Sequence, residues 1–253
     1  MSTPATFSRR HSLWFSAALL FLAAVVLIWP IGRYPLWGDE AWSMKGSELP
    51  LFDGISRFFY QDYHPPLYVL ALKAWRNLAG ESIFTARMLS VFFVLLTTAL
   101  ICRISADLFR SRKGALAAGA IFVTSDLVLA LGSYARQYSL YILLATLSGW
   151  LYWRYTQRWQ TRQGIAYTLS GIALAYTLYW GPFILLAHGL HSLIYHRRRI
   201  KHMALAGLGV GRQDAVVGGG ERIRSPAGRG RDHSIWGESR AVREANSRRR
   251  PPC

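Results

Sequence analysis

Apolar residues in this chain are gathered into long runs instead of being spread over the faces of amphipathic helices. The runs cover residues 12–30, 86–102, 115–133 and 164–195. About 20 apolar residues are enough to cross the hydrocarbon core of a bilayer as a helix. The pattern therefore predicts an all-α protein, a polytopic bundle of transmembrane helices.

Basic loops give these helices an orientation, because the cytoplasmic loops of membrane proteins carry an excess of Lys and Arg. Arg9 and Arg10 precede the first run and place residues 1–11, with the N-terminus, in the cytoplasm. No small-residue cleavage site follows this run, so we interpret it as a membrane span and not as a removed signal sequence. Residues 31–85 then form an external loop, with acidic residues at Asp39, Glu40, Glu48, Asp53, Asp62 and Glu81.

Residues 64–78 are apolar but are interrupted by Lys73 and Arg76, so they either cross the bilayer or lie on its surface. We expect a surface helix that begins after Pro65-Pro66, with both basic side chains reaching the headgroups. With that choice every later basic loop is cytoplasmic, whereas a full span would place those loops outside. The spans that follow are 86–106, 115–132, 138–153 and a hairpin over 164–195.

Gly181-Pro182 stands at the middle of the last apolar run and predicts a tight turn between two short spans of about 15 residues each. The count is then about six spans in a domain of residues 12–203. We expect a multi-pass protein of the cell (inner) membrane.

Composition supports this class. The chain has 52% apolar and 17% charged residues, with a formal net charge of +17. That charge would suggest a nucleic-acid partner in a soluble domain, but here it is explained by basic cytoplasmic loops, so we predict no nucleic-acid binding. The two cysteines, Cys102 and Cys253, give neither a disulfide framework nor the spacing of a metal site.

The composition changes after Met203 to Gly, Arg, Ser and Pro, and residues 204–253 contain no run that could span a membrane. One interpretation is a disordered basic cytoplasmic tail. The other is that these residues are translated out of frame, in which case the chain is a truncated product of a longer membrane enzyme. The sequence leaves both open.

Three polar clusters are predicted to meet at the external membrane face. Asp39 and Glu40 stand among aromatic residues directly after the first span, His64 precedes the two prolines, and Arg136 lies in a short turn between spans. Charged groups held against a bilayer are costly and usually functional. A solvated loop, a headgroup-contacting histidine and an arginine bound to lipid phosphate are the simpler explanations of the three clusters.

Four motifs in these regions resemble those of the polytopic membrane glycosyltransferases of the C-type fold. The motifs are Gly38-Asp39-Glu40, His64-Pro65-Pro66-Leu67-Tyr68, Ala86-Arg87-Met88-Leu89-Ser90 and Tyr134-Ala135-Arg136-Gln137-Tyr138-Ser139-Leu140. The similarity covers about residues 10–203. It is to the bacterial branch related to the dolichyl-phosphate-mannose protein mannosyltransferases and the lipid A aminoarabinose transferases.

The resemblance implies inverting transfer of a sugar from a polyprenyl-phosphate donor to a protein or glycolipid acceptor at the outer face. It makes Asp39 the catalytic base or orienting group for the acceptor hydroxyl, with Glu40 supporting the site or helping to hold a metal where one is used. Arg136 would bind the leaving phosphate. His64 stands where some relatives have a basic residue, which implies a contact with phosphate or metal, and Tyr138 stands where certain relatives have an acidic residue of the substrate-binding turn.

No cofactor is assigned by the sequence, and a divalent metal at this site is left open. His188 and His191 are three residues apart on one predicted helix, and we interpret them as packed polar residues and not as metal ligands. Two other functions remain as alternatives: a transporter or flippase, and an inactive truncated membrane protein. Repeated halves and helices broken at mid-bilayer are typical of transporters, whereas polarity here gathers at one face.

Overall fold

The computed structural model describes residues 9–50, 52–53, 56 and 64–195. All regular structure in these residues is helical, which confirms the predicted all-α fold. Residues 1–8 of the segment 1–11 that is predicted to be cytoplasmic, and the predicted tail 204–253, lie outside the described residues. The helices are α1 (Arg9–Ile28), α2 (Gly38–Glu48), α4 (Leu67–Ala79), α5 (Ile83–Phe109), α6 (Arg112–Val123), α7 (Asp126–Leu131), α8 (Tyr138–Arg158), α9 (Thr161–Ala175) and α10 (Gly181–Tyr195).

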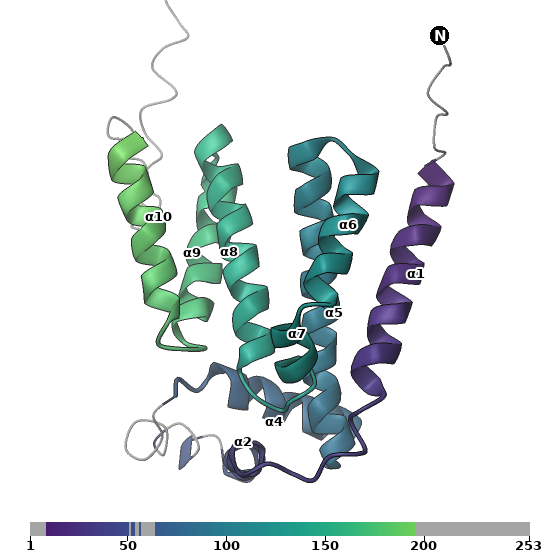
Figure 1. Cartoon of the computed structure of the whole chain (residues 1–253). Coiled ribbons are helices and arrows are strands. Elements are labelled where there is room, and N and C mark those ends of the chain that lie inside the picture. The colour runs from purple at the N-terminus through teal and green to yellow at the C-terminus, as the bar shows by residue number, and fades with distance from the viewer. Residues whose placement is uncertain (1–8, 51, 54–55, 57–63, 196–253) are drawn as a thin grey trace, which may run out of the picture. The chain divides into compact units, whose positions relative to one another are not determined.

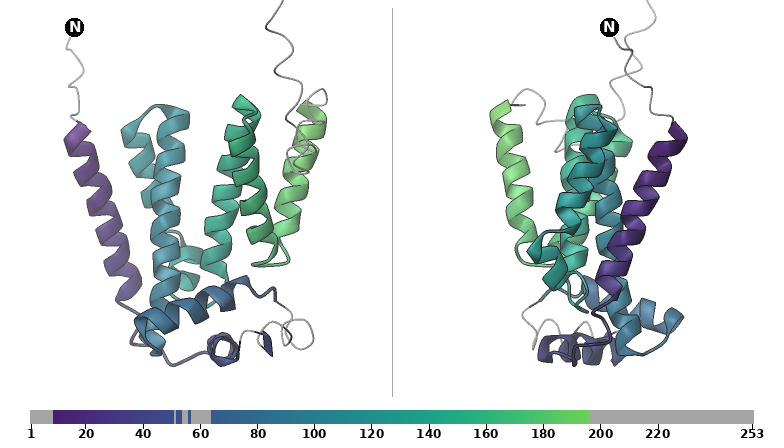
Figure 2. Two further views of the ribbon diagram at one scale, coloured as in Figure 1. Left: turned by 180° about the vertical axis from the view of Figure 1, so that it is seen from behind. Right: turned by 45° about the vertical axis from the view of Figure 1, so that its right-hand side comes forward.

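Most of the helices stand side by side, and α2 and α4 lie across one end of them (Figures 1 and 2). The upright helices are α1, α5, α6, α8, α9 and α10, and the two that lie across are α2 and α4. Helix α5 packs against α1, α4, α6 and α8, and α8 packs against α9 and α10. The position of α2 and α4 gives the molecule one end at which several chain segments meet.

Helix α4 confirms the helix expected after Pro65-Pro66, and its place on a membrane surface stays a prediction. It has 13 residues, so its length of about 20 Å is shorter than a bilayer core. The basic residues of α4 do not behave as expected. Lys73 donates to the carbonyl oxygens of Ser47 and Leu49, and buried Arg76 donates to that of Met44, so the prediction that they reach lipid headgroups is wrong.

The run 115–132, expected as one helix, is divided into α6 and α7. Side chains at the division explain it, because the hydroxyl of Thr124 donates to the carbonyl of Ala120 and that of Ser125 to the carbonyl of Phe122. Ser, Thr and Asp compete in this way with the helix for its own backbone groups. Val128 of α7 is buried against α1 and α5.

The turn of the last hairpin also differs from the prediction. It occupies residues 176–180, and Gly181 and Pro182 form the first turn of α10 instead of the turn itself. Proline is tolerated there, because the first N–H groups of a helix have no partner within the helix. The two helices have 15 residues each, as expected.

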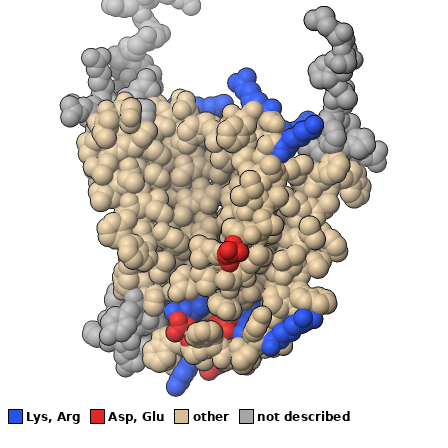
Figure 3. Space-filling model, in the orientation of Figure 1, with Lys and Arg blue, Asp and Glu red and all other residues tan. Residues whose placement is uncertain are grey.

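Among the described helices, α5 alone is long and apolar enough to cross a membrane on length and composition. A shorter apolar helix covers Trp14–Ile28. The six-span count therefore stays a prediction. On the face drawn in Figure 3, acidic side chains lie at the α2 and α4 end or partway along the helices, and the described charges at the other end are Lys and Arg.

Two buried apolar clusters join the helices toward the end where α2 and α4 lie, and the first of them includes α4. One joins α4, the beginning of α5 and the beginning of α8 through Leu72, Leu89 and Leu140. The other joins α1, α5 and α7 through Leu27, Val91 and Val128. This packing gives a firm support to the loops at that end.

Candidate functional site

Asp39 and Glu40 lie in the first turn of α2, and their side chains face different surroundings. The Glu40 residue is 1% exposed, whereas the Asp39 side chain is 65% exposed. Successive helix residues are rotated by about 100°, so neighbours point in different directions. One carboxylate therefore belongs to the core at this end, and the other faces outward.

Both oxygens of Glu40 accept hydrogen bonds from the protein. Arg87 donates through Nε and Nη2 at 2.9 and 2.6 Å, and the backbone N–H groups of Ala135 and Trp37 donate at 2.9 and 3.2 Å. Burial by itself would raise the pKa of Glu40, but these hydrogen bonds and the charge of Arg87 outweigh it and hold the pKa below its ordinary value. Glu40 is thus a buried anion that joins α2, α5 and the turn before α8.

Arg87 completes this junction on the side of α1. Its Nη1 donates to the carbonyl oxygens of Ile31 at 2.6 Å and Tyr34 at 3.0 Å, and its Nη2 donates to that of Pro35 at 3.0 Å. One guanidinium therefore fixes the path of the chain between α1 and α2. The sequence prediction gave Arg87 no role, although a charge at the start of an apolar run signals that a partner must exist.

Asp39 is held next to Arg136, which the sequence predicted at the same face. Arg136 Nη2 lies 3.5 Å from Asp39 Oδ2, and Nη1 donates to the Asp39 carbonyl at 3.1 Å and to Ser43 Oγ at 3.2 Å. The Arg136 side chain is 8% exposed. An outward-facing carboxylate is therefore bound to an almost buried cation 97 residues later in the chain.

The turn that carries Arg136 has further buried polar atoms. Arg136 Nε, Gln137 Nε2 and Ser139 Oγ are buried and have no hydrogen-bond partner among the described residues. Buried polar atoms are nearly always satisfied by protein, water or ligand, because an unmade hydrogen bond is costly. They lie at the beginning of α8, where helix N–H groups favour an anion. The turn can therefore offer several donors to a negatively charged group.

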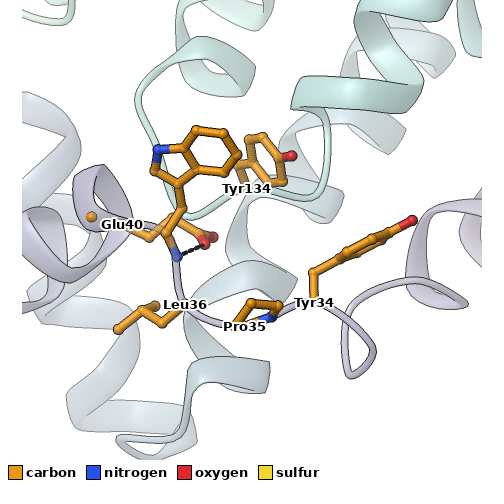
Figure 4. A pocket seen from close by; sticks show the side chains of 7 residues that line it. Tyr34, Pro35, Leu36, Glu40 and Tyr134 are labelled. Carbon is orange, nitrogen blue, oxygen red and sulfur yellow. Dashed lines mark hydrogen bonds between the residues drawn. The ribbon is translucent and has the colours of Figure 1, made fainter.

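A hollow of about 450 Å³ lies beside the first turn of α2 and the turn before α8 (Figure 4). Its wall is mostly apolar and aromatic, and the rings of Trp37 and Tyr134 approach to 6.4 Å between centroids. Glu40 forms part of the wall, and Asp39 is not among the lining residues, which are Tyr34, Pro35, Leu36, Trp37, Gly38, Glu40 and Tyr134.

A buried tyrosine lies in the interface between α4 and α5. The hydroxyls of Tyr68 and Ser90 are 3.3 Å apart, and burial raises the pKa of Tyr68 far above its ordinary value. Tyr68 therefore stays neutral and can take part in a hydrogen bond as a phenol. Its role here is to fasten α4 to α5.

His64 and Tyr138 lie at the same end of the helices but outside the bonded group described above. His64 is half-buried just before α4, and Tyr138 is the half-buried first residue of α8. The hydrogen bonds and the ion pair given above bring together Asp39, Glu40 and Arg136, three of the five predicted site residues.

A metal-ligand set is not formed within the part of the chain that the structure describes, where no three His, Cys, Asp or Glu side chains converge. Glu40, one predicted contributor, uses both oxygens for protein donors. His188 and His191 lie on α10 and contact Tyr152 of α8: its hydroxyl is 2.6 Å from His191 Nδ1, and its ring stacks on His188 at 4.5 Å. The two histidines are thus packed with polar and aromatic groups.

Part of this chain matches a protein-family model. Residues 63–211 match the model of a family described as dolichyl-phosphate-mannose-protein mannosyltransferase. The matched region contains His64, Arg87, Arg136 and Tyr138, and it begins after Asp39 and Glu40. No solved structure matches the chain.

Proposed function

Because the chain belongs to the dolichyl-phosphate-mannose-protein mannosyltransferase family, we propose that it transfers a sugar from a polyprenyl-phosphate donor to a protein or glycolipid acceptor at the outer face of the cell membrane. The family match supports membrane glycosyl transfer and a lipid-linked donor. The acceptor, the face of the membrane and the catalytic residue are proposed from the site.

The proposed topology uses the six upright helices as membrane spans, with the N-terminus in the cytoplasm and α2 and α4 at the outer surface. Exposed apolar side chains along these helices support it, because a bilayer is the solvent that suits them. Phe21 on α1 is 73% exposed, and Phe183 and Ile194 on α10 are 61% and 68% exposed. Arg110, Arg112, Lys113, Arg158 and Arg162 lie at the opposite end from α2, as the positive-inside rule expects.

The observation that carries the proposal is the exposed Asp39 carboxylate held next to the buried Arg136 guanidinium. A base for the acceptor and a cation for the leaving phosphate are what glycosyl transfer from a lipid phosphate needs within one site. The short turn before α8 supplies the cation, and α2 supplies the base.

In the proposed reaction the acceptor oxygen attacks the anomeric carbon and its proton passes to the Asp39 carboxylate. The bond between that carbon and the phosphate oxygen breaks, and the polyprenyl phosphate leaves with the electron pair. Attack from the face opposite the leaving group inverts the anomeric carbon. Arg136, with Gln137 and Ser139, stabilises the charge that collects on the phosphate, because these are donors already fixed in a buried turn.

Glu40 and Arg87 are proposed as positioning residues and not as catalytic residues. Their bonds fix the first turn of α2 relative to Ala135, and so they fix the separation between Asp39 and Arg136. The aromatic hollow at Trp37 and Tyr134 is proposed to hold the first isoprene units of the donor, since its wall is apolar and lies beside the phosphate-binding turn.

The test is transfer from radiolabelled polyprenyl-phosphate sugars in membranes that contain the chain. Asp39→Asn removes the base and keeps the shape, so we expect the rate to fall by about 10²- to 10⁴-fold. Glu81→Gln is the matched control, because it changes an exposed carboxylate at the same end of the helices. We expect this control to keep the rate of the unchanged chain.

Two results would contradict the proposal at different points. An Asp39→Asn chain that transfers at the unchanged rate would remove Asp39 from catalysis but leave the activity. A chain that inserts, unfolds cooperatively on heating and transfers sugar from no polyprenyl-phosphate donor would overturn the activity itself.

A further inference from the structure

A second hollow, of about 420 Å³, lies between the C-terminal ends of α5 and α8. It is far from the candidate site, since α5 and α8 both begin at the site and end at this hollow. Arg87 and Arg103 of α5 are 16 residues apart, or about 24 Å along the helix. The hollow is lined by Arg103 and Asp107 of α5 and by Trp153, Arg154, Gln157 and Arg158 of α8.

The charges around this hollow are unbalanced in favour of the cations. Three guanidinium groups face one carboxylate, and Asp107 accepts a hydrogen bond from Arg103 Nε at 3.2 Å. Arg154 is half-buried, and its guanidinium lies 4.9 Å from the centre of the Trp150 ring. At least one cation is thus held in place by an aromatic ring, which lowers the entropy lost when it binds an anion.

The position of the hollow suits a lipid headgroup. In the proposed topology it lies at the cytoplasmic boundary, about one bilayer core away from α2. Trp153 in its wall is 36% exposed, and tryptophan favours the boundary between headgroups and acyl chains. Basic pockets between membrane helices on the cytoplasmic side bind anionic headgroups, and arginine forks match phosphate oxygens.

We infer that this hollow binds the phosphate headgroup of an anionic phospholipid from the cytoplasmic leaflet, with Arg103, Arg154 and Arg158 as its ligands. The inference rests on the proposed membrane orientation and is independent of the proposed sugar transfer. A bound lipid would connect α5 and α8, the two helices that carry Arg87 and the phosphate-binding turn at their other ends.

The test is native mass spectrometry of the full chain in detergent, titrated with phosphatidylglycerol or with phosphatidylethanolamine. We expect the chain to retain phosphatidylglycerol in preference to phosphatidylethanolamine. In the double variant Arg154→Gln/Arg158→Gln the affinity for phosphatidylglycerol should fall about 25-fold, since each surface charge is worth about a factor of five. The control Lys113→Gln/Arg162→Gln removes the same charge at the same end but outside the hollow, and it should keep the affinity.

Asp107→Asn tests the inference in the opposite direction, and a misfolded protein could not give the expected result. The substitution removes the acidic wall residue, so phosphatidylglycerol should bind about fivefold more tightly. Equal losses in the two double variants, or weaker binding in Asp107→Asn, would overturn the inference. If inorganic phosphate displaced the lipid at an equal concentration, the hollow would be a site for free phosphate and the lipid assignment would be wrong. The lipid-binding measurement does not depend on sugar transfer, so a failure of the proposed transfer activity would leave its result unchanged.

Discussion

Adjacent carboxylates at the start of α2 can do different chemistry because their donors differ. Glu40 has four protein donors and almost no exposure, so it is a fixed anion. Asp39 has one side-chain ion pair at 3.5 Å and remains exposed, so it can approach a substrate hydroxyl. A group whose hydrogen bonds are all made resists protonation, whereas a proton acceptor in catalysis needs an open position.

Glu40→Gln is expected to destabilise the protein strongly, because it leaves Arg87 buried without its counter-charge. We expect a loss of about 3–5 kcal/mol in the free energy of unfolding at pH 7. The control Glu48→Gln removes an exposed carboxylate of the same helix that also pairs with an arginine, and it should cost less than about 1 kcal/mol. Thermal unfolding in detergent measures both, and equal effects would contradict the buried-pair argument.

The same pair gives a pH dependence with a defined sign. Since the pKa of Glu40 is lowered in the folded protein, its contribution to stability is complete above the ordinary Glu pKa of about 4.3 and is lost as the pH falls through the folded value. The stability difference between the unchanged chain and Glu40→Gln should therefore be constant near neutral pH and shrink below about pH 4. Melting curves from pH 7 to pH 3 measure this, and a constant difference throughout would be the opposite result.

Arg136 is expected to need both its charge and its fork. Arg136→Gln should lower the transfer rate by about 10²- to 10³-fold, the usual cost of removing a donor that stabilises a developing anion. Arg136→Lys keeps the charge but not the planar pair of guanidinium donors. Its transfer rate should lie between those of the unchanged chain and Arg136→Gln. Arg33→Gln is the control, since Arg33 is an exposed cation in the loop before α2 that lies over the Trp29 ring. An unchanged transfer rate in Arg136→Gln would contradict the proposed contact between Arg136 and the phosphate.

At this scale the sequence predicted which residues lie at the same face better than which partners each of them bonds. Asp39, Glu40 and Arg136 were expected at one face, and the structure brings them together. The Arg87 partner of Glu40 lies 47 residues away, and pairing over that distance depends on how α1, α2 and α5 pack. Helix periodicity alone shows that the side chains of two adjacent residues point in different directions, but it does not show which of them faces the core.

At the scale of elements, long apolar runs predicted the helices well, because burying an apolar face is the main source of helix stability. The positions at which one helix ends and the next begins were predicted poorly. The α6 and α7 division depends on hydroxyls that bond the preceding carbonyls, and the α9 and α10 turn lies just before Gly181 and not on it. Short polar residues and prolines have several favourable positions near a helix end, so a pattern cannot choose among them.

Gly181 itself is expected to be required by the close packing of the last hairpin. A Cβ atom at this position would lie 2.5 Å from the carbonyl oxygen of Leu174, a backbone atom that cannot move away cheaply. Gly181→Ala should destabilise the protein by about 1–3 kcal/mol. Gly189→Ala on the same helix meets nothing within 4 Å and should be neutral or slightly stabilising, which the same thermal unfolding assay would show. Equal effects of the two alanines would contradict the packing argument.

At the scale of the whole molecule, the proposed function requires the two ends of the upright helices to lie on opposite sides of a membrane. α2 and α4 lie at one end with the carboxylate site, and the basic loops lie at the other. If α4 crossed the bilayer, Glu81 would be on the other side from α2, and the later loops would reverse. Two positions at the α2 and α4 end and one at the beginning of α6 therefore decide the topology.

We expect Lys45 of α2 and Glu81 after α4 to be on the outside, and Lys113 to be inside. In a chain with Cys102 and Cys253 changed to Ser, single substitutions Lys45→Cys, Glu81→Cys and Lys113→Cys supply one thiol each at exposed positions. A membrane-impermeant maleimide should label the first two in intact cells and the third after permeabilisation. Labelling of Lys45→Cys and Lys113→Cys in intact cells, with Glu81→Cys labelled after permeabilisation, would mean that α4 spans the membrane. Labelling of Lys113→Cys alone in intact cells would reverse the orientation, and the carboxylate site would then face a cytoplasmic donor.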